Sequence, residues 1–310
     1  MAFPQWIYWL RNAPVRGFTL LIIWLVRVLP AKSGFALGGH VGGLAWKIFP
    51  RWRKTASRNL EIMFGEKYTP LERLEIGRKS AINLSYHVIE FIRMGFVRQE
   101  DALAMVVESE GEENFLNAIK DGRGAIALSL HYGNWEICAA YITKNIAQLN
   151  AVGKEQADDF FTNIAFPYRT RFGVKNIMSG NKANSAIIRA LRANEILGLV
   201  ADQNGGTTGL FVDFAGTKAS TVPGPAALAF KFKAPMVVTF CRRIAPGKHK
   251  FVAMPPVTTD DLPEDRQEAI LELLRRLNDV YAQVIAEDPT QWLWGHKRWK
   301  TRPVGEEWLY

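Results

Sequence analysis

A histidine and a glutamate stand five residues apart in the segment H-Y-G-N-W-E, which runs from His131 to Glu136 and directly follows the apolar run 124–130. Such a run is typical of a buried strand, and active sites of open α/β sheets gather at the carboxyl ends of strands. In one regular helix the two side chains would point about 140° apart. They can meet only if His131 lies on a turn, which Gly133 permits, and Glu136 lies in the first turn of a following helix.

This pair of residue types is suited to proton transfer. If Glu136 holds one ring nitrogen of His131 and fixes the tautomer, the other nitrogen can take a proton from a hydroxyl. The arrangement suits acyl transfer from a thioester, because the acceptor oxygen attacks directly and no serine or cysteine nucleophile is required. Backbone N–H groups near Gly133 and Asn134, at the start of the predicted helix, would suit an oxyanion hole.

Other chemistries lack the residues they need. No second histidine or cysteine lies at ligand spacing from His131, so we predict no metal site and no cofactor. No G-x-S-x-G elbow marks a serine hydrolase. Cys138 and Cys241 lie in apolar stretches and specify neither a disulfide framework nor a metal site. A histidine and a glutamate at this spacing also occur together by chance, so a purely structural pair remains an alternative.

The segments around the motif alternate between strand-like and helix-like patterns. Thr69-Pro70-Leu71-Glu72 is a capping box with proline at the first helical position, which predicts the start of a helix. This alternation favours an α/β fold with a central mixed, largely parallel sheet flanked by helices, in one catalytic domain over residues 61–310. A glycine- and threonine-rich loop is expected over 204–221. Strands are predicted over 104–108, 124–130, 149–153, 174–178, 196–201, 236–242 and 250–254, and helices over 112–120, 134–147, 158–172, 183–193, 224–232 and 265–287.

Residues 1–60 differ in composition from the rest of a chain whose formal net charge is +9. They contain nine Lys or Arg, no Asp or Glu, and five of the ten Trp: Trp6, Trp9, Trp24, Trp46 and Trp52. Tryptophan and cations together suit the headgroup layer of an anionic membrane. A nucleic-acid surface would also be basic, but no helix-turn-helix, zinc-finger or RNA-recognition pattern is present. We therefore predict an N-terminal membrane-associated helical segment and no nucleic-acid partner.

The N-terminal apolar run is short. It covers residues 17–26 and ends at Arg27, whereas a spanning helix needs roughly twenty residues. We expect helices that lie in the membrane surface or dip into it. A tilted single span and a buried helical hairpin of a soluble protein are the alternatives. A cleaved signal peptide fits poorly, because Arg27 interrupts the apolar region.

The motif also carries a resemblance to known proteins. H-Y-G-N-W-E resembles the H-x4-D/E signature of glycerolipid acyltransferases. Its particular residues are similar to the motif of the late acyltransferases of lipid A biosynthesis, the lauroyl and myristoyl transferases. The phosphatidylinositol mannoside acyltransferases are related to that family. The resemblance extends over most of the chain, through Arg53-Lys54-x4-Asn59-Leu60, Tyr168-Arg169-x-Arg171-Phe172-Gly173, Ala201-Asp202-Gln203-Asn204, Phe214-Ala215-Gly216, Thr221-x-Pro223-Gly224-Pro225-Ala226 and the tail 289–300.

The resemblance implies a glycerolipid acyltransferase-like fold, a fatty acyl donor on acyl carrier protein or coenzyme A, and a phosphorylated glycolipid acceptor. The enzyme would work at the inner (cytoplasmic) membrane with its catalytic domain facing the cytoplasm. The acceptor hydroxyl would belong to a lipid A precursor or to one of its acyl chains. A basic chain suits the anionic membrane surface, the acidic carrier protein and a phosphorylated acceptor alike.

The resemblance also implies roles for particular residues. His131 would be the general base and Glu136 its partner. Arg169, with Arg171 behind it, would bind phosphate or stabilise the thioester oxyanion. In ordinary structural terms the two arginines would be helix surface. Asp202 and Gln203 would position the acceptor or their own loop, or they would form a solvated turn. Asn134 is the remaining polar side chain of the motif and is expected to contact substrate.

Two other functions stay open at this stage. One is an acyltransferase for another lipid, such as a lysophospholipid, an ornithine lipid or a phosphatidylinositol mannoside. The other is a catalytically inactive, lipid-binding membrane module. A module without chemistry has no need for both His131 and Glu136, and the intact pair therefore favours an enzyme.

Overall fold

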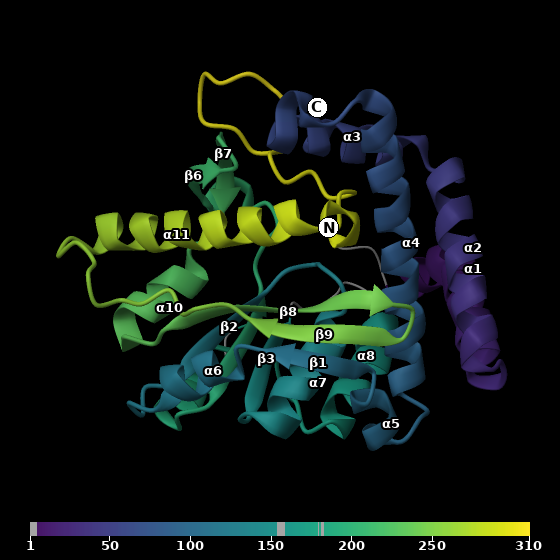
Figure 1. Cartoon of the computed structure of the whole chain (residues 1–310), viewed down its shortest axis with the longest axis horizontal. Helices are drawn as coiled ribbons and strands as arrows, with labels where there is room; N and C mark the ends of the chain where they lie inside the picture. Colours follow the sequence, from purple (N-terminus) through teal and green to yellow (C-terminus); the bar gives the residue numbers. More distant parts are fainter. Residues whose placement is uncertain (1–4, 154–158, 179, 181–182) are drawn as a thin grey trace.

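The computed structural model describes residues 5–153, 159–178, 180 and 183–310 (Figure 1). Residues 1–4 of the predicted membrane segment and residue 158 of one predicted helix lie outside this part of the chain, as do the side chains of Trp6 and Trp9. The described helices are α1 (Gln5–Val28), α2 (Ala31–Ile48), α3 (Pro50–Phe64), α4 (Pro70–Met94), α5 (Gln99–Leu103), α6 (Glu112–Ile119), α7 (Trp135–Asn145), α8 (Asp159–Arg171), α9 (Ala183–Arg192), α10 (Gly224–Phe232) and α11 (Arg266–Glu287).

A seven-stranded sheet forms the centre of the molecule, in the order β1-β9-β8-β2-β5-β3-β4. Neighbouring strands run parallel, apart from the antiparallel pair β8 and β9. The predicted mixed, largely parallel sheet is therefore confirmed. Its strands are β1 (Val106–Glu110), β2 (Ala125–Ser129), β3 (Leu149–Gly153), β4 (Lys175–Met178), β5 (Ile196–Val200), β8 (Met236–Ala245) and β9 (Lys248–Ala253).

Helices cover both faces of the sheet, because central parallel strands are apolar on both sides. Figure 1 shows α10 and α11 on one side of strands β8 and β9, and α6 and α7 on the other. The buried side chains of β2 alternate accordingly. Ile126 and Leu128 belong to the core under α9, α10 and α11, whereas Ala125 and Ala127 belong to the core under α6 and α7.

The predicted glycine- and threonine-rich loop contains secondary structure that the sequence reading missed. Strands β6 (Leu210–Phe214) and β7 (Thr217–Thr221) form an antiparallel hairpin there. Its two-residue turn places Ala215 and Gly216 at positive φ, which matches the twist of a tight hairpin. The prediction of a plain loop over 204–221 was therefore wrong over this hairpin.

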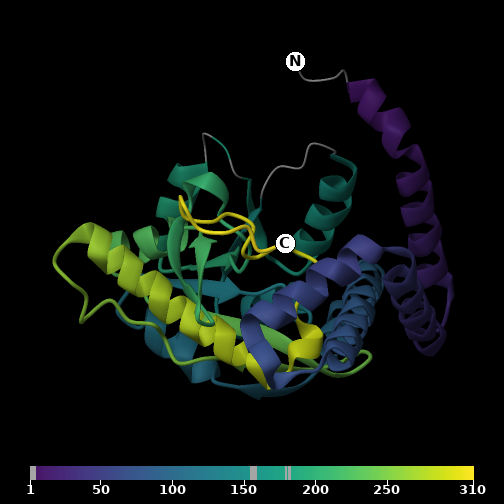
Figure 2. The same ribbon diagram turned by 90° about the horizontal axis from the view of Figure 1, so that it is seen from above.

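The N-terminal helices stand at one end of the sheet. The capping box predicted at Thr69 is present, and α4 runs from Pro70 to Met94 beside α2 and α3. Figure 2 shows α1 extending away from the body of the molecule. Asn59 of α3 donates hydrogen bonds to the carbonyl oxygens of Trp294 and His296, both 2.7 Å, and so joins α3 to the C-terminal tail. No helix within the described residues combines the length and apolarity needed to cross a membrane.

Candidate active site

His131 lies two residues beyond the carboxyl end of β2, on a turn that the neighbouring segments hold on both sides. The backbone N–H of Asn134 donates to the carbonyl of Cys241 (3.0 Å), and the carbonyl of His131 accepts from Leu293 N–H (3.0 Å). Gly133 adopts a φ of +58°, and a Cβ there would stand 2.0 Å from the carbonyl oxygen of Cys241. Only glycine fits this position, which confirms the turn predicted between the strand and helix α7.

The imidazole of His131 is bound by Asp202. The Nδ1 atom of His131 lies 2.7 Å from Oδ1 of Asp202, and the backbone N–H of His131 donates to Oδ2 at 2.9 Å. The indole Nε1–H of Trp292 also donates to Oδ2, at 2.7 Å. We expected Glu136 to hold the ring, but the structure puts Asp202 in that place. The reason is strand register: Ser129 pairs with Val200 in the parallel strands β2 and β5, so residues two positions further along each strand meet.

The electrostatics of this pair favour a base at Nε2. Burial disfavours the charged imidazole, but the Asp202 carboxylate outweighs burial and raises the pKa of His131. Burial also opposes the charge on Asp202, and the contacts with His131 and Trp292 more than compensate, so that the pKa of Asp202 is lowered. A carboxylate only accepts hydrogen bonds, so Nδ1 carries the proton and Nε2 has its lone pair. The His131 side chain is 23% exposed, which leaves the ring open to a substrate.

Glu136 lies in the first turn of α7 and pairs with Arg169 of α8. Arg169 Nε donates to Oε2 (2.7 Å) and Nη2 donates to Oε1 (2.5 Å), in the two-point geometry of a guanidinium with a carboxylate. Burial would raise the pKa of Glu136, but the contact with Arg169 outweighs it and lowers that pKa. Glu136 is almost fully buried, whereas the Arg169 side chain is 23% exposed. The Arg169 face that Glu136 does not occupy is therefore the part that can meet a ligand.

The remaining predicted site residues have different surroundings. Arg171 donates from Nη1 to the carbonyl oxygens of Met94 (3.3 Å) and Gly95 (2.8 Å), so its guanidinium caps the C-terminal end of α4 rather than standing behind Arg169 at the site. Gln203 follows Asp202 on the loop after β5 and is half-buried. Its role in positioning the acceptor stays a prediction.

Asn134 is fully buried beneath the catalytic turn. It is the N-cap of α7, because its Oδ1 accepts from the backbone N–H groups of Glu136 (3.1 Å) and Ile137 (3.0 Å). Its Nδ2 donates to the carboxylate of Glu90 at 2.9 Å. We expected Asn134 to contact substrate. The burial and these bonds correct that expectation and make it a structural support of the site.

The ring of Trp135 contacts the rings of two histidines. The ring centroid of His87 from α4 lies 3.6 Å from that of Trp135, in a stacked arrangement, and the His131 ring meets Trp135 edge-on at 5.1 Å. Burial lowers the pKa of His87 to about 4, so His87 is uncharged at neutral pH. Sequence reasoning missed His87 and Glu90, because nothing in the helix pattern of α4 distinguishes these positions from core.

An apolar cavity opens next to Glu136 and Arg169, between α7 and the strands β2, β3 and β5. Among the described residues, no group of three or more His, Cys, Asp or Glu side chains is placed to hold a metal ion. A histidine–carboxylate pair at the carboxyl ends of two neighbouring parallel strands, beside an apolar cavity, points to an α/β enzyme that acts on an apolar substrate. The cavity is lined by Ala127, Ser129, Trp135, Glu136, Cys138, Ala139, Ile142, Leu149, Ala151, Val152, Arg169, Gly198, Leu199, Val200 and Thr239.

Comparison with known proteins identifies that class as an acyltransferase. The model of the bacterial lipid A biosynthesis acyltransferase family matches residues 6–301, and the chain belongs to this family. Similar proteins include the lipid A biosynthesis lauroyltransferase of Escherichia coli (strain K12), 27% identical over 290 residues that cover 92% of this chain and 90% of the relative.

Two further relatives define the range of the similarity. The lipid A biosynthesis palmitoleoyltransferase of Escherichia coli (strain K12) is 25% identical over 306 residues, 98% of this chain and 95% of its own. A phosphatidylinositol mannoside acyltransferase of Mycobacterium tuberculosis (strain CDC 1551 / Oshkosh) is 25% identical over 187 residues, 59% of this chain and 56% of its own. The family resemblance inferred from the motifs is therefore confirmed, and the chain is an acyltransferase of a lipid A biosynthesis family.

Proposed function

We propose that the protein transfers a fatty acyl chain from acyl carrier protein to a hydroxyl of a lipid A precursor or of one of its acyl chains. The observation that carries this proposal is the contact between His131 and Asp202, which leaves Nε2 with its lone pair on a side chain that is 23% exposed. The family of the chain limits the reaction to acyl transfer. The names of the full-length relatives favour a lipid A acceptor.

The proposed reaction has two steps. In the first, Nε2 of His131 takes the proton of the acceptor hydroxyl while the oxygen attacks the thioester carbonyl, and Asp202 stabilises the imidazolium that forms. In the second, the C–S bond breaks and the departing thiolate takes the proton back from the imidazolium. The products are an ester and a free thiol, and the base returns to its starting state.

Arg169 and the apolar cavity complete the assignment. We propose that the cavity beside Glu136 receives part of the acyl chain of the donor, since Glu136 and Arg169 line it and its other lining residues are mostly apolar. Its volume of about 70 Å³ holds only a short stretch of that chain. Glu136 then fixes the direction of the Arg169 guanidinium, whose exposed face stabilises the thioester oxyanion or binds a phosphate. Glu136 acts in this scheme through Arg169 and not through the ring of His131.

We also propose that the enzyme works at the inner membrane, with the catalytic domain facing the cytoplasm. Helix α1 exposes large apolar side chains, among them Phe18 at 57% and Trp24 at 58%, and its last turn carries Arg27. Exposed aromatic side chains together with cations suit an anionic membrane surface. The excess of basic residues also suits an acidic carrier protein as donor.

The relative named as a phosphatidylinositol mannoside acyltransferase suggests a second class of acceptor. Its similarity extends over 59% of this chain. In that case the histidine base and the acyl cavity keep their roles, and only the acceptor differs. Coenzyme A in place of the carrier protein is the corresponding alternative for the donor.

A transfer assay with reconstituted protein tests the proposal. Lauroyl, myristoyl and palmitoyl donors are offered on carrier protein and on coenzyme A, with a phosphorylated lipid A precursor or a lysophospholipid as acceptor. Mass spectrometry should detect one added acyl group on the lipid A precursor, and His131→Ala should abolish it. Acylation of the lysophospholipid alone would move the enzyme to another pathway. Lipid binding without any turnover would favour the inactive membrane module.

A further inference from the structure

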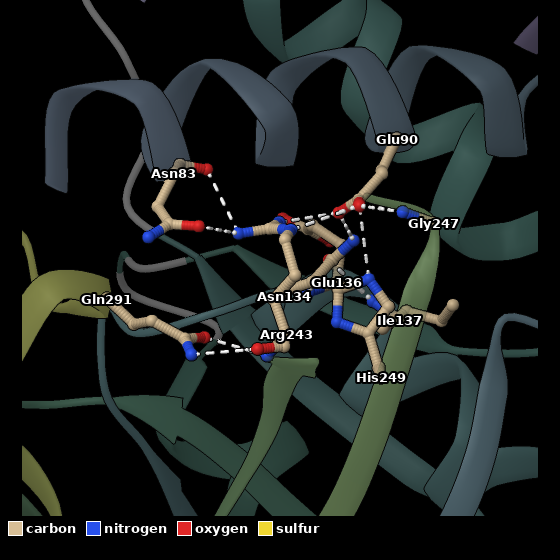
Figure 3. Close-up of polar contacts among 9 residues, drawn as sticks. All are labelled: Asn83, Glu90, Asn134, Glu136, Ile137, Arg243, Gly247, His249 and Gln291. Carbon is tan, nitrogen blue, oxygen red and sulfur yellow. Dashed lines mark hydrogen bonds and ion pairs between the residues drawn. The ribbon is translucent and has the colours of Figure 1, made fainter. Parts of the chain in front are cut away.

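A carboxylate is buried directly beneath the catalytic turn, on a helix outside the sheet. Glu90 of α4 has no exposed surface. Its oxygens accept from Arg243 Nη2 (2.6 Å) and from the backbone N–H of Gly247 (3.1 Å), and His249 Nε2 lies 3.2 Å away. Figure 3 shows these groups converging on the Glu90 carboxylate from strands β8 and β9 and from the turn between them, which contains Gly247.

The fourth group on this carboxylate belongs to the catalytic motif. Asn134 Nδ2 donates to Oε2 of Glu90 at 2.9 Å (Figure 3). An amide side chain has one donating and one accepting end, whereas a carboxylate only accepts. Glu90 therefore decides which way the Asn134 amide points. With Nδ2 turned to Glu90, Oδ1 must face the first turn of α7.

The orientation of the Asn134 amide directly affects the helix turn that carries Glu136. Oδ1 of Asn134 accepts from the backbone N–H groups of Glu136 and Ile137, so it caps the helix at the residue that binds Arg169. If the amide were reversed, two N–H donors of α7 would face the N–H donors of the amide. The first turn of α7 would then lose its cap, and the carboxylate of Glu136 would lose its fixed place.

The charge on Glu90 is secured by its surroundings. Burial would raise the pKa of this carboxyl group, but Arg243 and His249 together outweigh burial, so the pKa of Glu90 lies well below its usual range. Arg243 is itself held by Asn83, whose Oδ1 accepts from Nη1 at 2.9 Å, and by Gln291, which bonds its backbone N–H and carbonyl. The carboxylate thus stays ionised and fixed across the working pH range.

From these contacts we propose that Glu90 is a positioning residue for acyl transfer: it orients Asn134 and thereby sets the first turn of α7, which carries Glu136. Glu90 touches neither substrate nor reacting atoms and acts only through Asn134. The inference rests on the proposed function for its kinetic readout. It also predicts a difference in backbone protection that is measured without any substrate.

The decisive variant is Asn134→Asp. Aspartate and asparagine cap helices about equally well, so this change leaves the cap intact unless Glu90 interferes. Two carboxylates within hydrogen-bonding distance cannot both stay ionised without a large cost. The kcat of Asn134→Asp should therefore fall at least 10-fold with little change in KM, and should fall further relative to wild type as the pH rises, because the pair then loses its shared proton.

The double variant Glu90→Gln/Asn134→Asp returns one carboxylate and one amide to this contact. It should have a higher kcat than Asn134→Asp alone, and the extra pH dependence should disappear. Two independent structural losses would instead add. A double variant with a lower kcat than either Asn134→Asp or Glu90→Gln alone would therefore overturn the proposal.

Asn278→Asp is the matched control, because Asn278 is also fully buried and bonds the carbonyl of Asp213 and the hydroxyl of Thr221, away from the site. It should lower the thermal midpoint and leave the kcat of the folded enzyme unchanged.

Amide hydrogen exchange separates this inference from the proposed reaction. In Asn134→Asp the amides of Glu136 and Ile137 should exchange at least 10-fold faster than in wild type, and the double variant should restore their protection. This result would support the role of Glu90 even if wild-type enzyme showed no transfer to a lipid A precursor. Wild-type exchange at these amides in Asn134→Asp would refute it, whatever the activity.

Discussion

His131 and Asp202 are joined twice, through Nδ1 to Oδ1 at 2.7 Å and through the backbone N–H of His131 to Oδ2 at 2.9 Å. The second bond fixes the carboxylate relative to the turn, and the first fixes the ring relative to the carboxylate. Trp292 closes the arrangement from the tail by donating to Oδ2. The imidazole of this acyltransferase is therefore held in one tautomer by a residue at the end of the neighbouring strand.

The first prediction concerns the pH dependence of Asp202→Asn. Asp202 raises the pKa of His131, so in wild type the neutral imidazole that we propose as the base should be lost as the pH falls through a value above the ordinary one near 6.5. Without the carboxylate the pKa of His131 should drop, and the acid limb of kcat should move to lower pH. The rate should also fall by about 10²- to 10⁴-fold, because the imidazolium loses its partner and the tautomer is no longer fixed. Rate profiles between pH 5 and 9 would measure both effects.

A comparison of the variants Glu136→Gln and Asp202→Asn sharpens this result. Glu136→Gln should lower kcat while leaving the acid limb close to that of wild type, since Glu136 bonds Arg169 and Asp202 holds the ring. A shift of the limb in Glu136→Gln as large as that in Asp202→Asn would return Glu136 to the role of direct partner of His131.

The second prediction concerns the coupling between Glu136 and Arg169. Arg169→Lys keeps the positive charge but loses the two-point contact with the carboxylate. Glu136→Gln removes the negative charge that faces Arg169. Because the two residues form one unit, their effects on kcat/KM should not add, and the double variant should be little worse than the more severe single one. A double-mutant cycle on the transfer rate measures this coupling. Fully additive effects would show that Arg169 and Glu136 act separately.

The sequence predicted the α/β framework well, because apolar runs with turn residues between them define buried parallel strands such as β2 and β5. It also located His131 at a strand end. It did not predict Asp202 as the partner of the ring. That pairing depends on the register of β2 against β5, in which Ser129 meets Val200, and a register between separate strands is not visible in local spacing.

The spacing of the motif pointed to the nearest acid, Glu136, whereas tertiary structure turned that side chain towards Arg169 of another helix. Glu90 carried no local signal at all, since it lies 44 residues before Asn134 on a helix that pattern alone reads as support for the core. The β6–β7 hairpin was missed for a different reason. Its strands are short and its flanks are rich in glycine and threonine, which suggested an irregular loop.

The third prediction concerns the catalytic turn itself. Gly133→Ala should destabilise the protein severely, because the residue has a positive φ and the new Cβ would overlap the carbonyl oxygen of Cys241. Gly216→Ala is the matched control. Gly216 also has a positive φ, but nothing lies within 4 Å of its added Cβ, so the cost should be the backbone strain alone, about 1–2 kcal/mol. Chemical denaturation of both variants measures the difference, and equal losses would contradict the steric argument.

The fourth prediction concerns the exposed apolar face of α1. Phe18→Ser and Trp24→Ser should each weaken binding to vesicles that contain anionic lipid by about 10- to 100-fold, because a large apolar side chain contributes roughly 1.5–3 kcal/mol when it leaves water. Leu116→Ser is a suitable control, since Leu116 is also exposed but lies on α6 in the catalytic body. Co-sedimentation with vesicles measures binding. Equal effects of Leu116→Ser and Trp24→Ser would argue against α1 as the membrane-binding element.

The fifth prediction concerns the length of the acyl chain. Gly198 of β5 lines the apolar cavity, and a Cβ at this position would meet Cδ2 of Leu149 at 2.9 Å. Because a leucine side chain can shift, Gly198→Ala should fold and should reduce the cavity rather than destroy the site. Preference among lauroyl, myristoyl and palmitoyl donors should move towards the shorter chains, with His131 chemistry intact. Gly43→Ala is the matched control, because Gly43 lies on α2 with nothing within 4 Å of an added Cβ, and it should leave the preference unchanged. Competition between the three donors gives the ratio directly, and an unchanged ratio in Gly198→Ala would place the acyl chain in a different part of the enzyme.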